Sequence, residues 1–491
     1  MKLNKLFLAM SLVGASAAMT GCGGSSSSDS PDVVDPVAQG KTTNPVQAPI
    51  EAGDSCGTVG TQSGLELLME NGTYLPLCDL NGSITENATL TADNVYRLNG
   101  YITVGSGHAE LGDSDKSDAE VKQAVKDAGV TLTVDAGVHF RSSGRGSLII
   151  TRGSKISAQG TADAPIVMSS FDSGYDGQGE WGGLVIQGFA KNNKCGEGSL
   201  DVLCNTADEA GTGYHGGDDD ADNSGSISHL IVAEGGYEVA PDSEVNGITL
   251  HSVGYGTSIE NVMVYNNADD GIEWFGGAVN IKNLILIDNS DESLDWDDGY
   301  RGNVQFALVR QGLVNKGDHG IEADNKGLSN TATPISNPTI ANITFQTGPQ
   351  GADDLFRFKL GTQGTLVNIA ADNYKECVRV EHVETQVTLT NLLAECGSYS
   401  ETENVYVTAK EGALASQVSG VPTASATVEL GSAFEVTGGN AAVTSIEPAS
   451  ANGSTAFFTA TDYVGAVNPN VTAAENAWFA WAAKTIPAAF E

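Results

Sequence analysis

Basic residues are scarce in this sequence of 491 residues. It has 24 Lys and Arg against 62 Asp and Glu, which gives a net charge of −38 at pH 7. A surface this acidic repels phosphate backbones and attracts cations. We therefore exclude nucleic acid as a partner and expect bound cations. The sequence also contains no Gly-rich phosphate loop, no Gly-x-Ser-x-Gly motif and no His-Glu-x-x-His motif, so it predicts no nucleotide, serine-hydrolase or zinc-protease site.

Proline is rare and apolar runs are short. There are 14 Pro beside 60 Gly, and many short Val- and Ile-rich runs, which is typical of an all-β protein. A longer apolar run at 6–18 follows Lys2 and Lys5 and precedes Met19-Thr-Gly-Cys22. This run is too short to span a membrane as a mature helix, so it predicts a targeting segment.

The N-terminal pattern resembles the lipobox of bacterial lipoproteins. The resemblance implies that residues 1–21 are a signal peptide, that Cys22 carries the lipid (with palmitate as an acyl chain), and that the protein is anchored to the outer membrane of the cell envelope. An ordinary cleaved signal peptide is the alternative. Residues 22–50 are rich in Ser, Gly and Pro. They bury too little apolar area to fold and are expected to form a flexible tether.

The other six cysteines fall into three near pairs. In an exported protein an even number of cysteines predicts disulfides. Other pairings are possible, and we predict the sequential one, which is Cys56–Cys78, Cys195–Cys204 and Cys377–Cys396. No pair has the ligand spacing of a zinc site.

Four similar segments dominate the middle of the chain. They span 267–274, 289–296, 316–323 and 351–359, and the first two are 22 residues apart. Each has an acid-rich corner followed by a short apolar strand. A repeat of this length predicts a stacked β-solenoid. Because the coils would stack, the acids should form a ladder along one face.

The chain divides around this repeat. We expect an N-terminal segment at 51–130, the β-helix at 131–400, and C-terminal coils with a cap at 401–491. Ser117 and Glu120 form a capping box before Gly129, which predicts a short helical insertion at 117–128. Trp478 and Trp481 are expected to seal the last coil.

Two further patterns concern the strands. Trp274 and Trp296 alternate with outward-pointing residues, and we favour stacked core over a sugar-binding platform for them. Asn recurs at one position of a second strand, where rung-to-rung hydrogen bonds predict a structural ladder. Its members are Asn261, Asn283, Asn342, Asn368 and Asn391.

Several motifs are similar to those of a large group of exported bacterial proteins often named lipoproteins. The motifs lie at 153–161, 164–167, 181–188, 222–225, 246–250, 269–277, 294–300 and 463–466. The resemblance covers residues 95–491. It implies a right-handed parallel β-helix with coils of about 22 residues on the cell envelope, without a settled activity.

A looser resemblance is to the polygalacturonase family of glycoside hydrolases, which are also β-helices. Motifs of that family match 267–270, 291–292, 318–320 and 357–359 in the same order, although Glu292 and Asp318 replace an Asp and a Gly. The resemblance implies residues that activate water, donate a proton or orient a carboxylate, namely Asp269, Asp291, Glu292 and His319. The implied uronate-binding residues are Arg357 and Lys359.

The acid ladder also suits Ca²⁺, which takes about six to eight oxygen ligands. Candidate ligands on the ladder are Asp270, Glu273 and Asp295. A second candidate is the loop of Asp218, Asp220 and Asp222, whose acids alternate as in an EF-hand, although its Gly is displaced and His229 takes the twelfth position. A Ca²⁺-binding or structural ladder, a glycan-active site and a solvated acidic face all remain open.

Three functions follow. The leading hypothesis is a lipid-anchored envelope protein, a Ca²⁺-stabilised binding or scaffold protein for a glycan or an envelope partner. The competing hypothesis is a hydrolase of acidic polysaccharides. The third is an accessory lipoprotein that partners an outer-membrane uptake receptor.

Overall fold

The computed structural model describes residues 46–47, 56–172, 174–195, 202–208, 210–240, 243–396, 406–422, 427–437, 457–472 and 477–491. The predicted signal peptide and Cys22 lie outside the described residues, as does the tether apart from β1 (Val46–Gln47). In the described part of the chain, no helix is long and apolar enough to cross a membrane.

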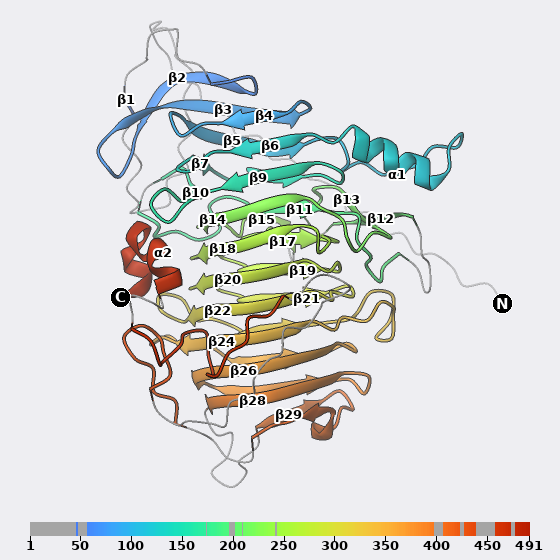
Figure 1. Cartoon of the computed structure of the whole chain (residues 1–491), viewed down its shortest axis with the longest axis vertical. Coiled ribbons are helices and arrows are strands. Elements are labelled where there is room, and N and C mark those ends of the chain that lie inside the picture. Colours follow the sequence, from blue (N-terminus) through green and yellow to red (C-terminus); the bar gives the residue numbers. More distant parts are fainter. Residues whose placement is uncertain are drawn as a thin grey trace, which may run out of the picture. The chain divides into compact units, whose positions relative to one another are not determined.

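The main sheet has 26 strands and winds into a parallel β-helix, which confirms the predicted fold class (Figure 1). One side, called face A, is a ladder of one strand per coil. Its strands are β8 (Ser147–Ile150), β11 (Leu184–Gln187), β17 (Ile248–His251), β19 (Ile272–Phe275), β21 (Leu294–Asp297), β23 (Ile321–Ala323), β25 (Asp354–Phe358), β27 (Glu376–Glu381) and β29 (Val407–Lys410).

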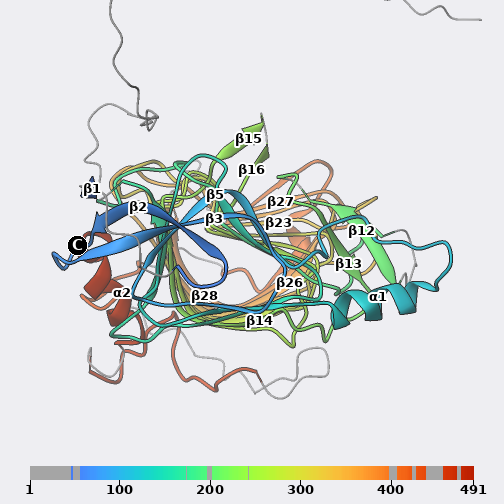
Figure 2. The same ribbon diagram turned by 90° about the horizontal axis from the view of Figure 1, so that it is seen from above.

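A second ladder forms the other two sides. In this ladder β14 (Gly225–Ala233) pairs with β9 (Lys155–Gln159) through its first half and with β10 (Ile166–Ser170) through its second. Later coils fuse both halves into one bent strand, and we call the first half face B and the second face C. These strands are β18 (Ser258–Tyr265), β20 (Asn280–Ile287), β22 (Asn303–Gln311), β24 (Thr339–Thr347), β26 (Gln363–Tyr374) and β28 (Gln386–Cys396), and the short β30 (Val418–Ser419) follows on face B alone. Seen from above, the coils superpose (Figure 2).

The bend between faces B and C lies at the predicted Asn ladder. All five Asn have positive φ, between 54° and 58°, a left-handed conformation that Asn tolerates better than most residues. Asn283 donates to Asn261 and Asn391 donates to Asn368, each at 3.0 Å. Phe306 takes the corner between Asn283 and Asn342, so the Asn ladder is interrupted at this coil.

The core lies between the three faces. Ile272, Trp274, Leu294 and Trp296 are fully buried, and Trp274 stacks on Tyr300 with ring centroids 5.0 Å apart. Both Trp residues are therefore core and not a sugar platform. The three predicted disulfides are present.

The N-terminal part begins with an antiparallel pair, β2 (Gly60–Leu68) and β3 (Tyr74–Ile84). Strand β3 already pairs in parallel with β5 (Val95–Val104), so the β-helix starts upstream of the predicted boundary at residue 131. The first coils include β4 (Ala88–Leu90), β6 (Thr131–Val134) and β7 (His139–Ser142). Helix α1 (Asp118–Asp127) starts at Ser117 with the predicted capping box. Two hairpins, β12 (Leu203–Ala207) with β13 (Tyr214–Gly217) and β15 (Glu238–Ala240) with β16 (Ser243–Glu244), project from later coils.

Trp478 and Trp481 do not seal the last coil as predicted. The described residues of the C-terminal segment include α2 (Ala480–Thr485) and cover the outside of face C (Figure 1). There, one outward row is apolar in five successive strands, namely Val167, Ile231, Met263, Ile285 and Leu308. Trp481 and Phe479 pack on this row. The apolar row needs cover because exposed apolar area is unfavourable in water, and this need directs the C-terminus to the side of the β-helix.

Candidate acid site on face A

The candidate site is built by the register of face A. Glu273, Asp295 and Glu322 are paired residues on β19, β21 and β23, and the same row continues with Arg357 and Arg379. Paired residues of neighbouring parallel strands lie about 4.8 Å apart and point to the same side. The residues before and after each member of this row point into the core, so the row itself points outward. The register of the strands alone therefore stacks three acids.

The turns before these strands bring a second set of acids. Asp270, Glu292 and His319 each lie two residues before the first core residue of their strand, and the backbone N–H of Glu292 donates to Oδ1 of Asp270 at 2.9 Å. Asp269, Asp291 and Asp318 each lie one residue earlier. The turns are thus stacked in step with the strands.

These acids form overlapping groups of close oxygens. One oxygen from each member lies within 4.8 Å of the others in three groups, which are Asp269–Asp270–Asp291, Asp270–Glu292–Asp295 and Asp291–Glu292–Asp318. We call these six residues the acid site. A further group, Glu292–His319–Glu322, adjoins it.

The close packing of like charges changes the protonation of the acid site. Burial and then the charge of Glu292 raise the pKa of Asp270 and of Asp295 well above the usual range. The same two causes raise the pKa of the partly exposed Asp291 to about 7. Oδ1 of Asp295 is buried and has no hydrogen-bond partner among the described residues. Such an oxygen is costly unless a proton or a cation meets it.

His319 carries positive charge to the edge of the acid site. Its Nδ1 lies 2.5 Å from Oε1 of Glu292 and 3.5 Å from Oε2 of Glu322, and its Nε2 lies 3.4 Å from Oδ2 of Asp354. Burial lowers the pKa of His319, but the hydrogen bonds with Asp354 and Glu292 outweigh burial and raise it to about 9. The resemblance implied that His319 orients a carboxylate, and the structure brings it against Glu292.

The spacing of the acids bears on their chemistry. Opposite ligands of one Ca²⁺ lie about 4.6–5.2 Å apart, since each Ca–O distance is about 2.3–2.6 Å. The two carboxyl groups of a glycosidase lie about 5–5.5 Å apart in retaining enzymes and about 6.5–9.5 Å apart in inverting enzymes. In each group of three, oxygens within 4.8 Å of one another have the spacing of ligands in one cation shell. All six donors are carboxylates, the hard ligands that Ca²⁺ prefers.

Arg357 and Lys359, the implied uronate-binding residues, are engaged by neighbouring acids. Arg357 Nη1 lies 3.1 Å from Glu322 and its Nε lies 3.4 Å from Glu381. Lys359 forms ion pairs with Glu322 and Asp324. Both cations therefore already have counter-ions, which leaves less charge for a ligand.

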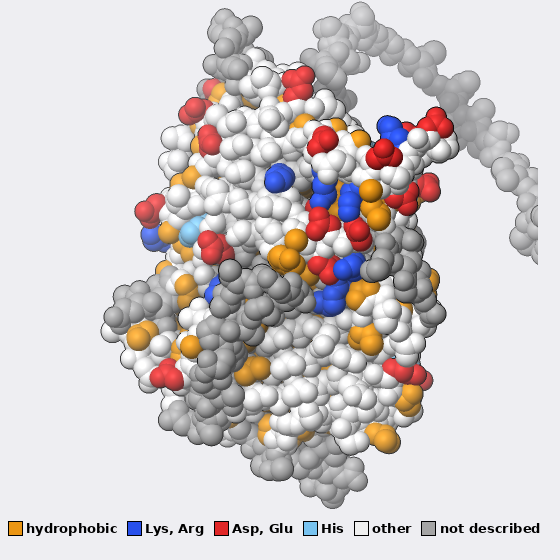
Figure 3. Space-filling model, turned by 45° about the vertical axis from the view of Figure 1, so that its right-hand side comes forward, with side chains coloured by type: hydrophobic (Ala, Val, Ile, Leu, Met, Phe, Trp, Pro, Cys, Tyr) orange, Lys and Arg blue, Asp and Glu red, His pale blue; other side chains and the backbone are white. Residues whose placement is uncertain are grey.

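The second Ca²⁺ candidate, the loop with Asp218, Asp220 and Asp222, is paired with basic side chains. Asp220 lies 3.2 Å from Lys191 and 2.8 Å from Arg301. On helix α1, Lys122 pairs with Asp218, and Lys126 lies 3.2 Å from Asp222. Figure 3 shows acidic and basic side chains side by side below α1. Within the described ranges, no acid cluster with metal-ligand spacing includes these three residues, so the loop docks the helix.

The structure also adds residues that sequence reasoning did not assign to the site. Asn246 donates to Oε2 of Glu273 at 2.5 Å, and Arg379 lies 2.8 Å from Asp354. Glu322 and Asp354 belong to the aligned columns of the repeat, so the alignment could have added them. Asn246 precedes the recognised copies and carries no such signal.

The fold and the site together define a parallel β-helix with a largely buried acid cluster on one face. The family model for a pectate-lyase-like β-helix domain matches residues 115–445. The chain therefore belongs to this family. Searches of the curated proteins and of the solved structures found no match.

Proposed function

We propose that this protein is a lipid-anchored protein of the cell envelope whose acid site binds Ca²⁺ and, through it, an acidic glycan. One observation carries the proposal. Oδ1 of Asp295 is a buried acceptor that has no hydrogen-bond partner among the described residues, and it belongs to the group with Asp270 and Glu292. A Ca²⁺ ion would satisfy this oxygen and offset the repulsion between the acids. Proteins of the matching family are described as pectate-lyase-like, which favours a polysaccharide ligand.

The binding role follows from the charge of the site. Uronate carboxylates would be repelled by the bare acids, whereas a Ca²⁺ ion held by only some of its ligands from the protein can accept the remaining oxygens from a glycan. Four members of the acid site remain partly exposed, namely Asp269, Asp291, Asp295 and Asp318, and the Asp318 side chain is 44% exposed. The glycan is therefore expected to reach the ion beside these residues.

Hydrolysis is the second candidate, and one observation favours it. Asp291 is partly exposed and its pKa is raised to about 7 by burial and by Glu292, as a general acid requires. In this case Asp291 would donate a proton, and Asp269 with Glu292 would act on water while His319 holds Glu292.

Calorimetric titration of chelator-treated protein with CaCl₂ tests the leading proposal. Asp295→Asn keeps the shape of the side chain and should weaken Ca²⁺ binding at least tenfold. Asp163→Asn is the matched control, because the Asp163 side chain is 91% exposed and its ion pair is with Lys484, which is not part of the acid site. Equal Ca²⁺ affinity of the wild type and Asp295→Asn would reject the cation site.

Polygalacturonate and other acidic polysaccharides then separate the two functions. Ca²⁺-dependent binding without release of reducing ends supports a binding protein. Release that Asp291→Asn abolishes, in a variant with unchanged melting temperature, would make the protein a hydrolase. The anchor has its own test, since Cys22→Ala should abolish incorporation of labelled palmitate and release the protein from membranes.

A further inference from the structure

Four successive coils repeat one polar pattern at the start of face B. Each has a carboxamide followed two residues later by a hydroxyl. The amides are those of Asn337, Gln363, Gln386 and Gln417, and the hydroxyls are those of Thr339, Thr365, Thr388 and Ser419. Gln363 pairs with Gln386, and the four hydroxyl-bearing residues are paired from strand to strand. The register therefore stacks two ladders side by side, one of amides and one of hydroxyls.

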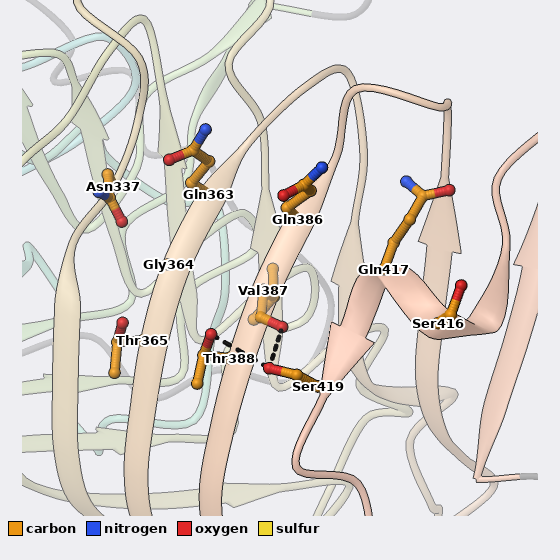
Figure 4. Close-up of a pocket in the computed structure, with 10 residues that line it drawn as sticks. All are labelled: Asn337, Gln363, Gly364, Thr365, Gln386, Val387, Thr388, Ser416, Gln417 and Ser419. Atoms are coloured by element: carbon orange, nitrogen blue, oxygen red, sulfur yellow. Dashed lines mark hydrogen bonds between the residues drawn. The ribbon is translucent and has the colours of Figure 1, made fainter.

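The members of these ladders other than Thr339 line an open groove of about 540 Å³. Figure 4 shows Gln363, Gln386 and Gln417 side by side, with the hydroxyls of Thr365 and Thr388 below them. Gly364 lies on β26 between Gln363 and Thr365 and faces the core beside Trp296, so these two polar side chains point outward into the groove. No residue that lines the groove is charged, which is notable in a protein with a net charge of −38.

The groove combines ordered and available hydrogen-bonding groups. Nε2 of Gln417 donates to the backbone oxygens of His382 and Thr385 at 3.0 and 2.6 Å, and Ser419 lies 3.2 Å from Thr388. The amides of Gln363 and Gln386 make no hydrogen bond with any described residue, so both can bind a ligand. Each amide offers two donors and an acceptor.

Apolar residues accompany the amides. Val383 and Leu414 lie three residues before Gln386 and Gln417 on the turns that lead into face B, and they are 59% and 65% exposed. These two residues do not line the groove. The amides and hydroxyls that line it match a sugar ring, which has hydroxyls at its edge, and exposed aliphatic groups match the C–H groups on its faces. The absence of a lining charge disfavours a uronate or a phosphate, because neither would find a counter-ion.

We propose that this groove binds a neutral oligosaccharide that runs across the coils. The pattern recurs once per coil at a spacing of about 4.8 Å, which is close to the length of one pyranose unit, so successive sugar units would meet equivalent amides and hydroxyls. Stacked repeats suit extended ligands for this reason. The groove differs from the acid site in residues, face and charge, and it needs no Ca²⁺.

The test is calorimetric titration of the full protein with cellohexaose, xylohexaose and mannohexaose. At least one should bind, and Gln363→Ala and Gln386→Ala should each weaken that binding about tenfold, the loss of one or two hydrogen bonds. Gln350→Ala, an exposed Gln on a loop, should leave it unchanged. Chelator and Asp295→Asn should also have no effect, which separates this groove from the acid site.

Three results would overturn the proposal. The first is no binding of any hexasaccharide at millimolar concentration. The second is an equal loss of oligosaccharide affinity in Gln350→Ala and Gln386→Ala. The third is self-association in sedimentation that Gln386→Ala abolishes, because the ladders would then be an interface between copies of the chain. Melting temperatures of the Gln variants confirm that each is folded, and truncation of these partly exposed side chains should barely change them.

Discussion

Nδ1 of His319 and Oε1 of Glu292 lie 2.5 Å apart and join two successive coils of the β-helix. Both side chains are buried, and His319→Gln leaves Glu292 without its cation, whereas Glu322 and Asp354 keep their Arg and Lys partners. We expect a loss of about 3–5 kcal/mol in the free energy of unfolding at pH 6, measured by urea denaturation of metal-free protein.

The same pair predicts a pH dependence. The pKa of His319 is about 9 in the folded protein and about 6.5 when unfolded. Because the folded pKa is raised, the stabilisation is fully present below pH 6.5 and disappears as the pH rises through 9. The difference in stability between wild type and His319→Gln should therefore be large at pH 6 and small at pH 10. A difference that does not change with pH would show that His319 acts through packing and not through charge.

The acids predict the pH response of the metal-free protein as a whole. The pKa values of Asp291 and Asp324 are raised by burial, with further contributions from Glu292 and Asp297 respectively, to about 7 and about 8. Raised carboxyl groups bind protons more tightly in the folded state, so stability is lost as the pH rises from about 4, their unfolded value, through these pKa values. The melting temperature without metal should be several degrees lower at pH 8 than at pH 5.

Calcium separates this prediction from a general effect of net charge. A cation in the acid site replaces the protons, so millimolar Ca²⁺ should raise the melting temperature at pH 8 far more than at pH 5. Asp295→Asn should reduce that gain, whereas Asp163→Asn should keep it. An equal gain at both pH values would mean that Ca²⁺ binds elsewhere.

The fold could be predicted from the repeat in the sequence, because residues that align between copies of the repeat are paired in the sheet. Ile272 and Leu294 align in the sequence and are paired in space, and the acids next to them follow by the alternation of the strand. Contacts made outside the repeat could not be predicted in this way. The ion pair of Lys122 with Asp218 joins residues 96 apart, and no periodicity relates α1 to that loop.

The pairing of charges at the site also could not be predicted from the sequence. The resemblance to polygalacturonases implied that Arg357 and Lys359 hold a uronate. Their ion pairs to Glu322 depend on which side chains reach across the coils. The sequence places a residue on a face, whereas the choice among neighbouring counter-ions depends on side-chain conformation.

The corner ladder predicts a graded response to substitution. Asn283 has a φ of 58° and donates to Asn261 at 3.0 Å. Asn283→Ala loses the hydrogen bond and also strains the left-handed backbone, so we expect a loss of about 1–3 kcal/mol. Asn283→Gly removes the hydrogen bond but relieves the strain. The stability of Asn283→Gly in urea should therefore lie between that of the wild type and that of Asn283→Ala. If both variants lose the same free energy of unfolding, the left-handed corner conformation carries no cost.

The packing of the C-terminus on face C predicts that its aromatic residues stabilise the whole β-helix. Trp481 is 4% exposed, packs on the apolar row with Met263 and Ile285, and lies with its ring centroid 5.2 Å from that of His229. Trp481→Ala should cost about 3–5 kcal/mol of unfolding free energy and expose the row to the dye ANS. Trp478→Ala is the matched control, because Trp478 is only partly buried at the edge of the same cluster and should cost clearly less. A Trp481→Ala variant with wild-type stability and no dye binding would show that face C does not need the C-terminal segment, and the apolar row would then require another explanation.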